Sequence, residues 1–207
     1  MRIITISREF GSGGRELGKR LADALGFDYY DREIISAIAN TKGMDESYVS
    51  HALEHHGWQN IPLTFRSSFA GVPSVQSIQT DLLIAQKQVI DRIAKAGKDC
   101  VIVGRNADVL LKDYEPFRLF VCAEMEAKVK RCMERAQEQE HFSPKELEKR
   151  IHRIDKTRAR TRELLTSTPW GESHTYDLTV NTTTWNIKEL TAAVAPFAQL
   201  WFGRNKT

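Results

Sequence analysis

The chain has 207 residues and a mass of 23.6 kDa, enough to bury the core of one domain. Hydrophobic residues make up 41% of it and charged residues 28%, a balance that excludes a wholly disordered chain, a collagen and a coiled-coil rod. Thirty Lys and Arg residues against 27 Asp and Glu residues leave a net charge of +3, which by itself indicates neither a nucleic-acid partner nor a membrane surface.

No apolar stretch approaches the roughly 18 residues that a transmembrane helix needs. The apolar run at the N-terminus is also too short for a signal peptide, so we expect a cytoplasmic protein. Three cysteines, Cys100, Cys122 and Cys132, show no disulfide or metal-binding spacing. They predict buried, reduced thiols.

Short β-branched runs alternate with helical patterns along the chain. The predicted strands are residues 3–6, 27–30, 100–103, 117–121 and 178–181. The predicted helices follow the glycine-rich turn at 11–14, Asp31 and Ser143, and also span about 78–96, 125–135 and 187–199. Ser143 and Asn186 are predicted helix caps.

Strands separated by helices predict an α/β fold with a parallel sheet covered by helices on both faces. We expect a single domain over residues 1–207, in which residues 44–76 form a helix and a mobile loop inserted in the main fold. Ligands of such sheets bind at the carboxyl ends of the strands. The residues that follow the strands are therefore the candidate site.

The turn after the first strand is the most informative segment. It contains Gly11, Gly13 and Gly14, between a predicted strand and a predicted helix, with Arg8 and Arg15 on either side. Glycines let a backbone wrap closely around an anion, and a helix N-terminus directs free N–H groups at it. This arrangement favours phosphate binding, and a tight turn without a ligand is the alternative.

The turn is an incomplete P-loop. A P-loop has Lys after its last loop glycine and then Ser or Thr, whereas this chain has Gly14, Arg15 and Glu16 at these positions. Arg15 is a candidate substitute for the missing cation, because a guanidinium binds phosphate oxygens as a fork. A dinucleotide-binding fingerprint does not fit, since position 16 is Glu.

A basic segment lies near residue 155. Residues 149–162 contain seven Lys or Arg residues and one acid, Asp155, which shares a predicted helix face with Arg158 and Arg162 at i, i+3 and i+7. Three interpretations are open: a solvated face, a nucleic-acid patch, and arginines that close over a transferring phosphate. No aromatic residues or binding motif support the nucleic-acid interpretation.

Six motifs occur in an order that resembles the cytidylate kinase-like family of the nucleoside monophosphate kinases. They are ITISREFGSGGRE at 4–16, YDREI at 30–34, VIVGRNAD at 101–108, DKTRA at 155–159, WG at 170–171 and YDLTVN at 176–181. The likeness spans most of the chain and is weakest between about 44 and 80.

This resemblance implies a three-layer P-loop kinase fold with a five-stranded parallel sheet, an inserted substrate-binding segment at 44–76 and a helical lid at about 136–172. The implied reaction transfers the γ-phosphate of ATP, with Mg²⁺, to a nucleoside monophosphate, CMP or dCMP. The implied partner is thus a small nucleotide, with no nucleic acid and no membrane. The oligomeric state stays open.

The resemblance also implies roles for individual residues. The catalytic residues would be Arg15, Arg158 and Arg162. The ATP-binding residues would be Arg8, Gly11, Ser12, Gly13, Gly14, Arg15, Glu16, Asn181 and Thr182. The acceptor-binding residues would be Asp31, Arg105, Asn106, Asp108, Arg153, Asp155 and Arg160. Asp31 has an equal claim to be a helix N-cap.

No metal ligand is assigned. In related kinases the third strand ends in Asp-Gly-Arg, whereas this chain has Val103, Gly104 and Arg105, and the nearest carboxylates are Asp108 and Glu9. A second candidate metal site, His51, Glu54, His55 and His56, has two His at i and i+4 but no evident third ligand. A solvated helix face explains it better.

Two other functions remain open. The missing loop lysine and strand-three carboxylate favour a nucleotide-binding regulatory protein without catalysis, and the divergent residues 44–76 leave room for a kinase of another small substrate.

Trp170 and Gly171 either order the end of the lid or only pack. The aromatic residues Trp185, Phe197, Trp201 and Phe202 predict packing of the last helix.

Overall fold

The computed structural model describes residues 1–54, 75–135 and 142–204. Its centre is one five-stranded sheet in the order β2-β3-β1-β4-β5, with all neighbouring strands parallel. The strands are β1 (Ile3–Arg8), β2 (Asp28–Tyr30), β3 (Cys100–Val103), β4 (Phe117–Cys122) and β5 (Leu178–Asn181). The predicted parallel sheet and its five strands are therefore confirmed, with bounds that differ by one or two residues.

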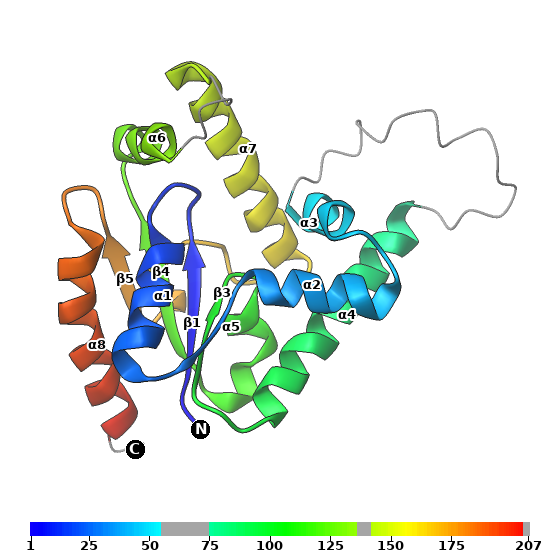
Figure 1. Ribbon diagram of the computed structural model, residues 1–207, viewed down its shortest axis with the longest axis horizontal. Helices are drawn as coiled ribbons and strands as arrows, with labels where there is room; N and C mark the ends of the chain where they lie inside the picture. The colour runs from blue at the N-terminus through cyan, green and yellow to red at the C-terminus, as the bar shows by residue number, and fades with distance from the viewer. Residues whose placement is uncertain (55–74, 136–141, 205–207) are drawn as a thin grey trace, which may run out of the picture.

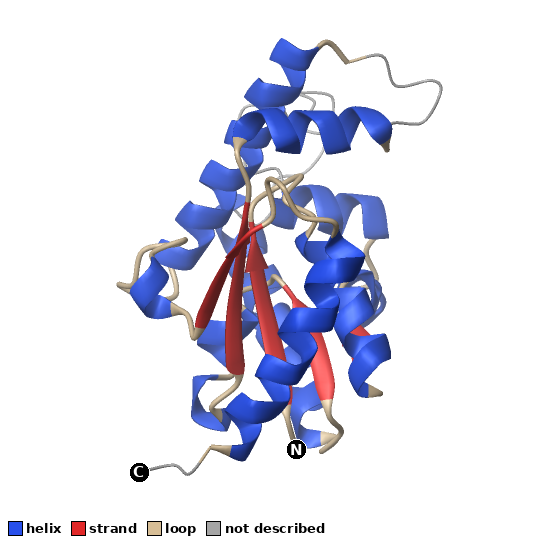
Figure 2. Ribbon diagram, turned by 90° about the vertical axis from the view of Figure 1, so that its left-hand side faces the viewer, coloured by secondary structure: helices blue, strands red, loops and turns tan. Residues whose placement is uncertain are grey.

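Helices cover both faces of the sheet (Figures 1 and 2). One face carries α1 (Gly14–Leu25) and α8 (Ile187–Gly203), and the other carries α2 (Arg32–Lys42), α4 (Val75–Lys95) and α5 (Ala107–Leu110). The remaining elements are α3 (Glu46–Glu54), which packs on α2, α6 (Met125–Glu134), α7 (Pro144–Glu163), and the 3-10 turns η2 (Lys112–Tyr114) and η3 (Ser173–Thr175). Both α6 and α7 stand over the carboxyl ends of the strands, far from the N-terminus.

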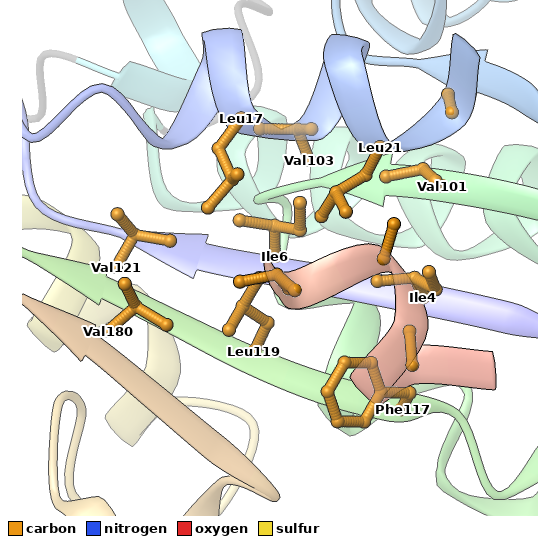
Figure 3. Packing of buried hydrophobic residues seen from close by; sticks show 14 of the residues in the cluster. Ile4, Ile6, Leu17, Leu21, Val101, Val103, Phe117, Leu119, Val121 and Val180 are labelled. Atoms are coloured by element: carbon orange, nitrogen blue, oxygen red, sulfur yellow. The ribbon is translucent and has the colours of Figure 1, made fainter. Parts of the chain in front are cut away.

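The central strands β1 and β3 are buried on both faces, which is why they read as continuous apolar runs, whereas the edge strands β2 and β5 are only partly buried. Side chains alternate: Ile4 and Ile6 of β1 pack toward α1 and α8, whereas Ile3 packs toward α2 and α4. Figure 3 shows the first of these two layers, where Leu17 and Leu21 of α1 meet β1, β3 and β4. Because both layers are packed with buried apolar side chains, the sheet holds the ends of its strands in fixed positions.

The order of the strands places the candidate site. After β1 the chain crosses to β2 on one side, returns through β3, and then adds β4 on the other side of β1. The connections therefore part at the carboxyl end of β1, which is where open α/β sheets form a ligand crevice. Residues 9–13 join β1 to α1 at this point and contain most of the glycine-rich turn. They are called the loop below.

The helix caps follow the sequence in two of three cases. Ser143 forms a complete capping box with Glu146, and the Asn186 side chain accepts a hydrogen bond from Lys188 N at 2.9 Å. Asp31 stands at the N-cap position of α2 as predicted, but its side chain makes no capping hydrogen bond. Its carboxylate is engaged elsewhere, as described below.

Three other expectations need correction. α8 runs to Gly203, four residues beyond the predicted end at 199, because Trp201 and Phe202 pack on Phe117. Trp185 does not pack and is 53% exposed. Cys100 is buried as predicted, but the free thiols of Cys122 and Cys132 are only half-buried. Among the described residues no helix is long and apolar enough to cross a membrane.

Phe117 is the test residue for this packing. It is fully buried, and its ring centroid lies 5.2 Å from that of Trp201 and 5.9 Å from that of Phe197. Phe117→Ala should lower the free energy of unfolding by about 3–5 kcal/mol. Urea titration followed by circular dichroism measures this. Leu200→Ala, in α8 but 75% exposed, should change it by less than about 0.5 kcal/mol.

Candidate active site

The glycine-rich turn has the backbone conformation of an anion-binding loop. Gly11 and Gly13 have φ angles of 77° and 83°, which side-chain-bearing residues rarely adopt, and Gly13 is the N-cap of α1. The Ser12 hydroxyl donates to the Glu9 carbonyl at 2.8 Å and closes the turn. The first N–H groups of α1 therefore lie at the end of β1, where they and the helix dipole favour an anion.

The residues after β5 support this turn. Thr182 is fully buried, and its hydroxyl donates to the Ser12 carbonyl at 2.6 Å. Arg131 of α6 holds Thr182 in turn, through the Thr182 hydroxyl at 3.2 Å and through its carbonyl. Asn181 is exposed and caps its own turn by accepting from Thr183 N at 2.9 Å. Of the two predicted residues, Thr182 thus contacts the loop and Asn181 does not.

Four arginines from four elements meet beside the loop: Arg8 of β1, Arg15 of α1, Arg105 after β3 and Arg158 of α7. Arg15 Nε lies 2.5 Å from Asp31 Oδ2, and Arg8 Nη2 lies 3.8 Å from Asp31 Oδ1. The Asp31 side chain is only 4% exposed, so this carboxylate is a buried partner of the arginines. The sequence predicted these five residues as site residues, and the structure brings them together.

The pKa of Arg8 reflects its burial beside other arginines. Burial, followed by the charge of Arg158, lowers the pKa of Arg8 to about 9, although Asp31 opposes the shift. Arg105 and Arg15 lower it further. Desolvation and nearby like charges both disfavour the charged form of a guanidinium. An anion bound between these side chains would relieve that cost.

The lid helix candidate α7 is attached directly to the loop. The Phe10 backbone N–H donates to Asp155 Oδ1 at 2.7 Å, and Arg158 Nη1 donates to the Arg8 carbonyl at 2.9 Å. The Arg158 guanidinium also lies over the Phe10 ring, 5.8 Å from its centroid. Asp155 was predicted to bind the acceptor, but its carboxylate is instead occupied by the loop.

Lys128 of α6 belongs to the same contact and was missed in the sequence. Its side chain is 7% exposed, and its Nζ lies 3.1 Å from Glu9 Oε2 and 3.9 Å from Asp155 Oδ2. Burial raises the pKa of Asp155, and the Phe10 N–H, Arg158 and Lys128 oppose this. The available signal was a lysine next to Val129 on the apolar face of α6, where a cation needs a buried partner.

Arg162, the third predicted catalytic residue, contacts another partner. Its guanidinium is 3% exposed and pairs with Asp108 Oδ2 at 2.5 Å, while its Nε donates to the Thr168 carbonyl at 3.1 Å. The Ser7 hydroxyl donates to Asp108 Oδ1 at 3.4 Å. This buried pair joins the end of α7 to α5, and through Ser7 to the end of β1. It places Arg162 and Asp108 away from the cavity described next.

A cavity of about 1150 Å³ opens above the loop. The loop, α2, α3, α6 and α7 all contribute to its lining. Eight arginines line it against two glutamates, Glu9 and Glu46. These arginines are Arg8, Arg15, Arg32, Arg105, Arg131, Arg135, Arg150 and Arg158. Its size and its many arginines suit phosphate-bearing ligands.

Several predicted residues lie outside the described lining. Arg153 and Arg160 are exposed on α7, and neither lines the cavity as described. Asn106, with φ 51°, lines only a smaller neighbouring cavity of about 50 Å³. Glu16 pairs with Arg20 at 2.9 Å and with Arg135. Trp170 packs edge-on against Phe120, with centroids 5.3 Å apart, which agrees with its packing interpretation.

No metal site is built from protein groups in the part of the chain that the structure describes. There, no three His, Cys, Asp or Glu side chains are grouped to hold an ion. Of the histidine candidate, His55 and His56 lie outside the described residues, as do the side chains of His51 and Glu54. Glu9 and Asp155, the carboxylates nearest the loop, are held by Lys128.

These features match one protein family. Residues 3–184 correspond to the cytidylate kinase-like family. The chain belongs to this family. A search of the curated proteins found no match to the sequence.

Solved structures agree on the fold. An uncharacterized protein from Eubacterium ventriosum superimposes with a TM-score of 0.70 at 24% identity, covering 96% of this chain and 99% of that one. The shikimate kinase of Bacteroides thetaiotaomicron superimposes with a TM-score of 0.57 at 14% identity, covering 96% of this chain and 98% of that one. The shikimate kinase of Acinetobacter baumannii in complex with shikimate superimposes with a TM-score of 0.53 at 13% identity, covering 100% of this chain and 96% of that one. The fold of this family member is thus that of the P-loop kinases.

The buried pair of Asp108 and Arg162 gives a stability test. Asp108→Ala would leave the Arg162 guanidinium buried without its carboxylate, so the free energy of unfolding should fall by about 3–5 kcal/mol. Chemical denaturation measures the change. Asp23→Ala breaks the exposed Lys19–Asp23 pair and should cost at most about 0.5 kcal/mol. Equal effects of the two substitutions would contradict a structural role for the buried pair.

Proposed function

We propose that the protein transfers the terminal phosphoryl group of ATP to a nucleoside monophosphate, with CMP or dCMP as the preferred acceptor. The observation that carries this proposal is the cluster of Arg8, Arg15, Arg105 and Arg158, placed between the phosphate-binding loop and the ends of β2 and β3. Membership of the cytidylate kinase-like family supports phosphoryl transfer. The cytoplasm, where ATP is available, is the expected location.

The cavity divides naturally between donor and acceptor. The loop and the N-terminus of α1 would hold the ATP phosphates, and Thr182 and Arg131 support the loop from behind. Arg32 of α2 and Ser47 of α3 line the part of the cavity that these two helices form. An acceptor bound there would direct its phosphate at the arginine cluster.

Phosphoryl transfer of this kind needs no covalent intermediate with the protein. An oxygen of the acceptor phosphate attacks the terminal phosphorus of ATP, the bond from that phosphorus to the bridging oxygen breaks, and ADP leaves with the bonding electron pair. Charge develops on the transferred group and on the leaving oxygen. Preorganised cations at this point lower the barrier, and an acceptor held in line contributes as much by positioning.

Mg²⁺ would neutralise phosphate charge as a complex with ATP. The described residues do not form a binding site for it, since Glu9 and Asp155 are held by Lys128. The nucleotide phosphates and water would then supply most of its ligands. Asp155 and Arg158 of α7 contact the loop, which supports a lid role for this helix. A closed lid would exclude water from the transferred group.

Gly14 favours a second candidate function, a nucleotide-binding protein without catalysis. The residue stands where the P-loop lysine contacts the β- and γ-phosphates. Such a protein would bind ATP in calorimetry but would release no ADP with any acceptor. Turnover therefore separates the two functions.

The assay is ADP release from ATP and Mg²⁺ in the presence of CMP, dCMP, UMP, AMP or shikimate in turn. We expect stimulation by a nucleoside monophosphate, with CMP or dCMP giving the highest kcat/KM. Stimulation by shikimate alone would replace the acceptor but keep the reaction class. If no acceptor accelerates ADP release above the ATP-only rate, phosphoryl transfer to these acceptors is wrong.

Arg158→Ala should reduce kcat by about 100- to 1000-fold, because it removes a preorganised cation from the transferred group. Lys156→Ala is the matched control, since Lys156 lies on the same helix and is exposed. The control should leave kcat within about twofold of the unmodified protein. Thermal unfolding of both variants separates loss of catalysis from loss of structure. An Arg158→Ala variant with normal turnover would contradict the role of Arg158.

A further inference from the structure

The chain departs from the P-loop pattern at two positions, not one. In G-x-x-x-x-G-K the second glycine corresponds to Gly13, so the first glycine falls on Arg8 and the lysine on Gly14. The chain therefore carries a cation where the pattern has glycine, and glycine where the pattern has the cation. The two departures are opposite in kind and lie at the two ends of the same turn.

The structure places these two positions in direct contact. A Cβ atom at Gly14 would lie 2.6 Å from Cβ and 3.1 Å from Cγ of Arg8. Real Cβ atoms do not approach that closely, so the stem of Arg8 already fills the space that a side chain at position 14 would need. A lysine at 14 and an arginine at 8 exclude one another.

The Arg8 side chain continues from there toward the acceptor strands. Its guanidinium reaches Gly104 after β3, where an added Cβ would lie 1.6 Å from Nη1, and it ends 3.8 Å from Asp31 Oδ1. Gly104 also has φ +75°, so this position is closed to other residues for two reasons. The Arg8 side chain thus extends from the start of α1 to the ends of β2 and β3. Its guanidinium lies where the donor and acceptor phosphates would meet.

Among the described residues, Asp31 is the carboxylate that pairs with this guanidinium, and the pair is a long one. Its distance from Asp31 is too long for a hydrogen bond, and among the described residues Asp31 Oδ1 has no hydrogen-bond partner. Arg15, Arg105 and Arg158 surround it with like charge. A purely structural buried arginine would be paired closely, as Arg162 is with Asp108.

We propose that Arg8 takes the place of the P-loop lysine and neutralises the phosphoryl group during transfer. This inference rests on the proposed function and assigns the cation within it. Arg15, the substitute that the sequence favoured, is half-exposed and serves another purpose: its Nε binds Asp31 and holds that carboxylate beside Arg8. Arg8 is therefore the catalytic cation and Arg15 its positioning residue.

An exchange of the two residues tests the proposal. Arg8→Gly removes the cation, and Gly14→Lys adds a lysine into occupied space, so each single variant should lose at least about 100-fold in kcat/KM. The double variant R8G/G14K restores the pattern at both positions. It should recover to within about tenfold of the unmodified protein, because the stem of Arg8 is gone, Val121 Cβ at 3.2 Å has to shift by only a few tenths of an ångström, and the lysine reaches the same phosphates.

Binding of ATP by calorimetry gives a readout that needs no turnover. Arg8→Gly should weaken ATP binding at least tenfold, and the exchange should restore it. Arg8→Gln, which keeps the aliphatic stem of the side chain and a polar end without the charge, replaces Arg8→Gly if that variant unfolds. Thermal unfolding of each variant without nucleotide identifies such a failure.

The outcomes separate the inference from the proposed function. If the unmodified protein transfers phosphate and Arg8→Gln keeps kcat/KM within about threefold, the role of Arg8 is wrong and the kinase function stands. If the unmodified protein transfers nothing, the kinase function is wrong, and the calorimetry still decides whether Arg8 binds the nucleotide. A double variant no better than its singles would overturn the exchange.

Discussion

The crowding of positive charge at the carboxyl edge of the sheet is the constraint on which this site depends. Four arginines from β1, α1, α7 and the end of β3 lie close together. Among the described residues, Asp31 pairs with Arg8 and Arg15, and Asp155 pairs with Arg158, with Lys128 and with the backbone of the glycine-rich turn. Desolvated like charges raise the free energy of a fold unless an anion offsets them. The sheet must therefore be rigid enough to hold the arginines in place, and its two dry layers provide that rigidity.

The buried cations of this protein fall into two groups with different consequences. Lys128 and Arg162 each have a carboxylate within hydrogen-bonding distance: Lys128 joins α6 to the loop, and Arg162 joins α7 to α5. Arg8 is equally buried, but its carboxylate partner Asp31 lies 3.8 Å away and other arginines surround it. A cation of the first kind is closely paired inside the chain, so its role is structural. A cation of the second kind is stabilised further when something negative binds, which is the property required of a phosphate site.

The fold could be predicted because its signals are local. The β1–turn–α1 unit has its strand, its glycines and its apolar helix face within about 25 consecutive residues, and the Ser143 capping box involves four. The site was predicted only in part. Spacing at i, i+3 and i+7 put Arg158 and Arg162 on one helix face, but α7 crosses the edge of the sheet, so its last turn enters the interior while Arg158 still faces the cavity. Lys128 was missed because its carboxylate partners are distant in sequence.

The glycine at position 14 has a different meaning in three dimensions than in the sequence. Read alone, it is a lost lysine and favours a binding protein without catalysis. In the structure the same position is empty of side chain because Arg8 fills it, and Gly104 makes room for the other end of that arginine. If the loop had lost its catalytic function, we would expect a neutral side chain in this buried space, since burying a guanidinium among arginines costs stability. A charged side chain nevertheless occupies it. This favours a change in the position of the cation within the loop over its loss, and so favours the catalytic function over simple nucleotide binding.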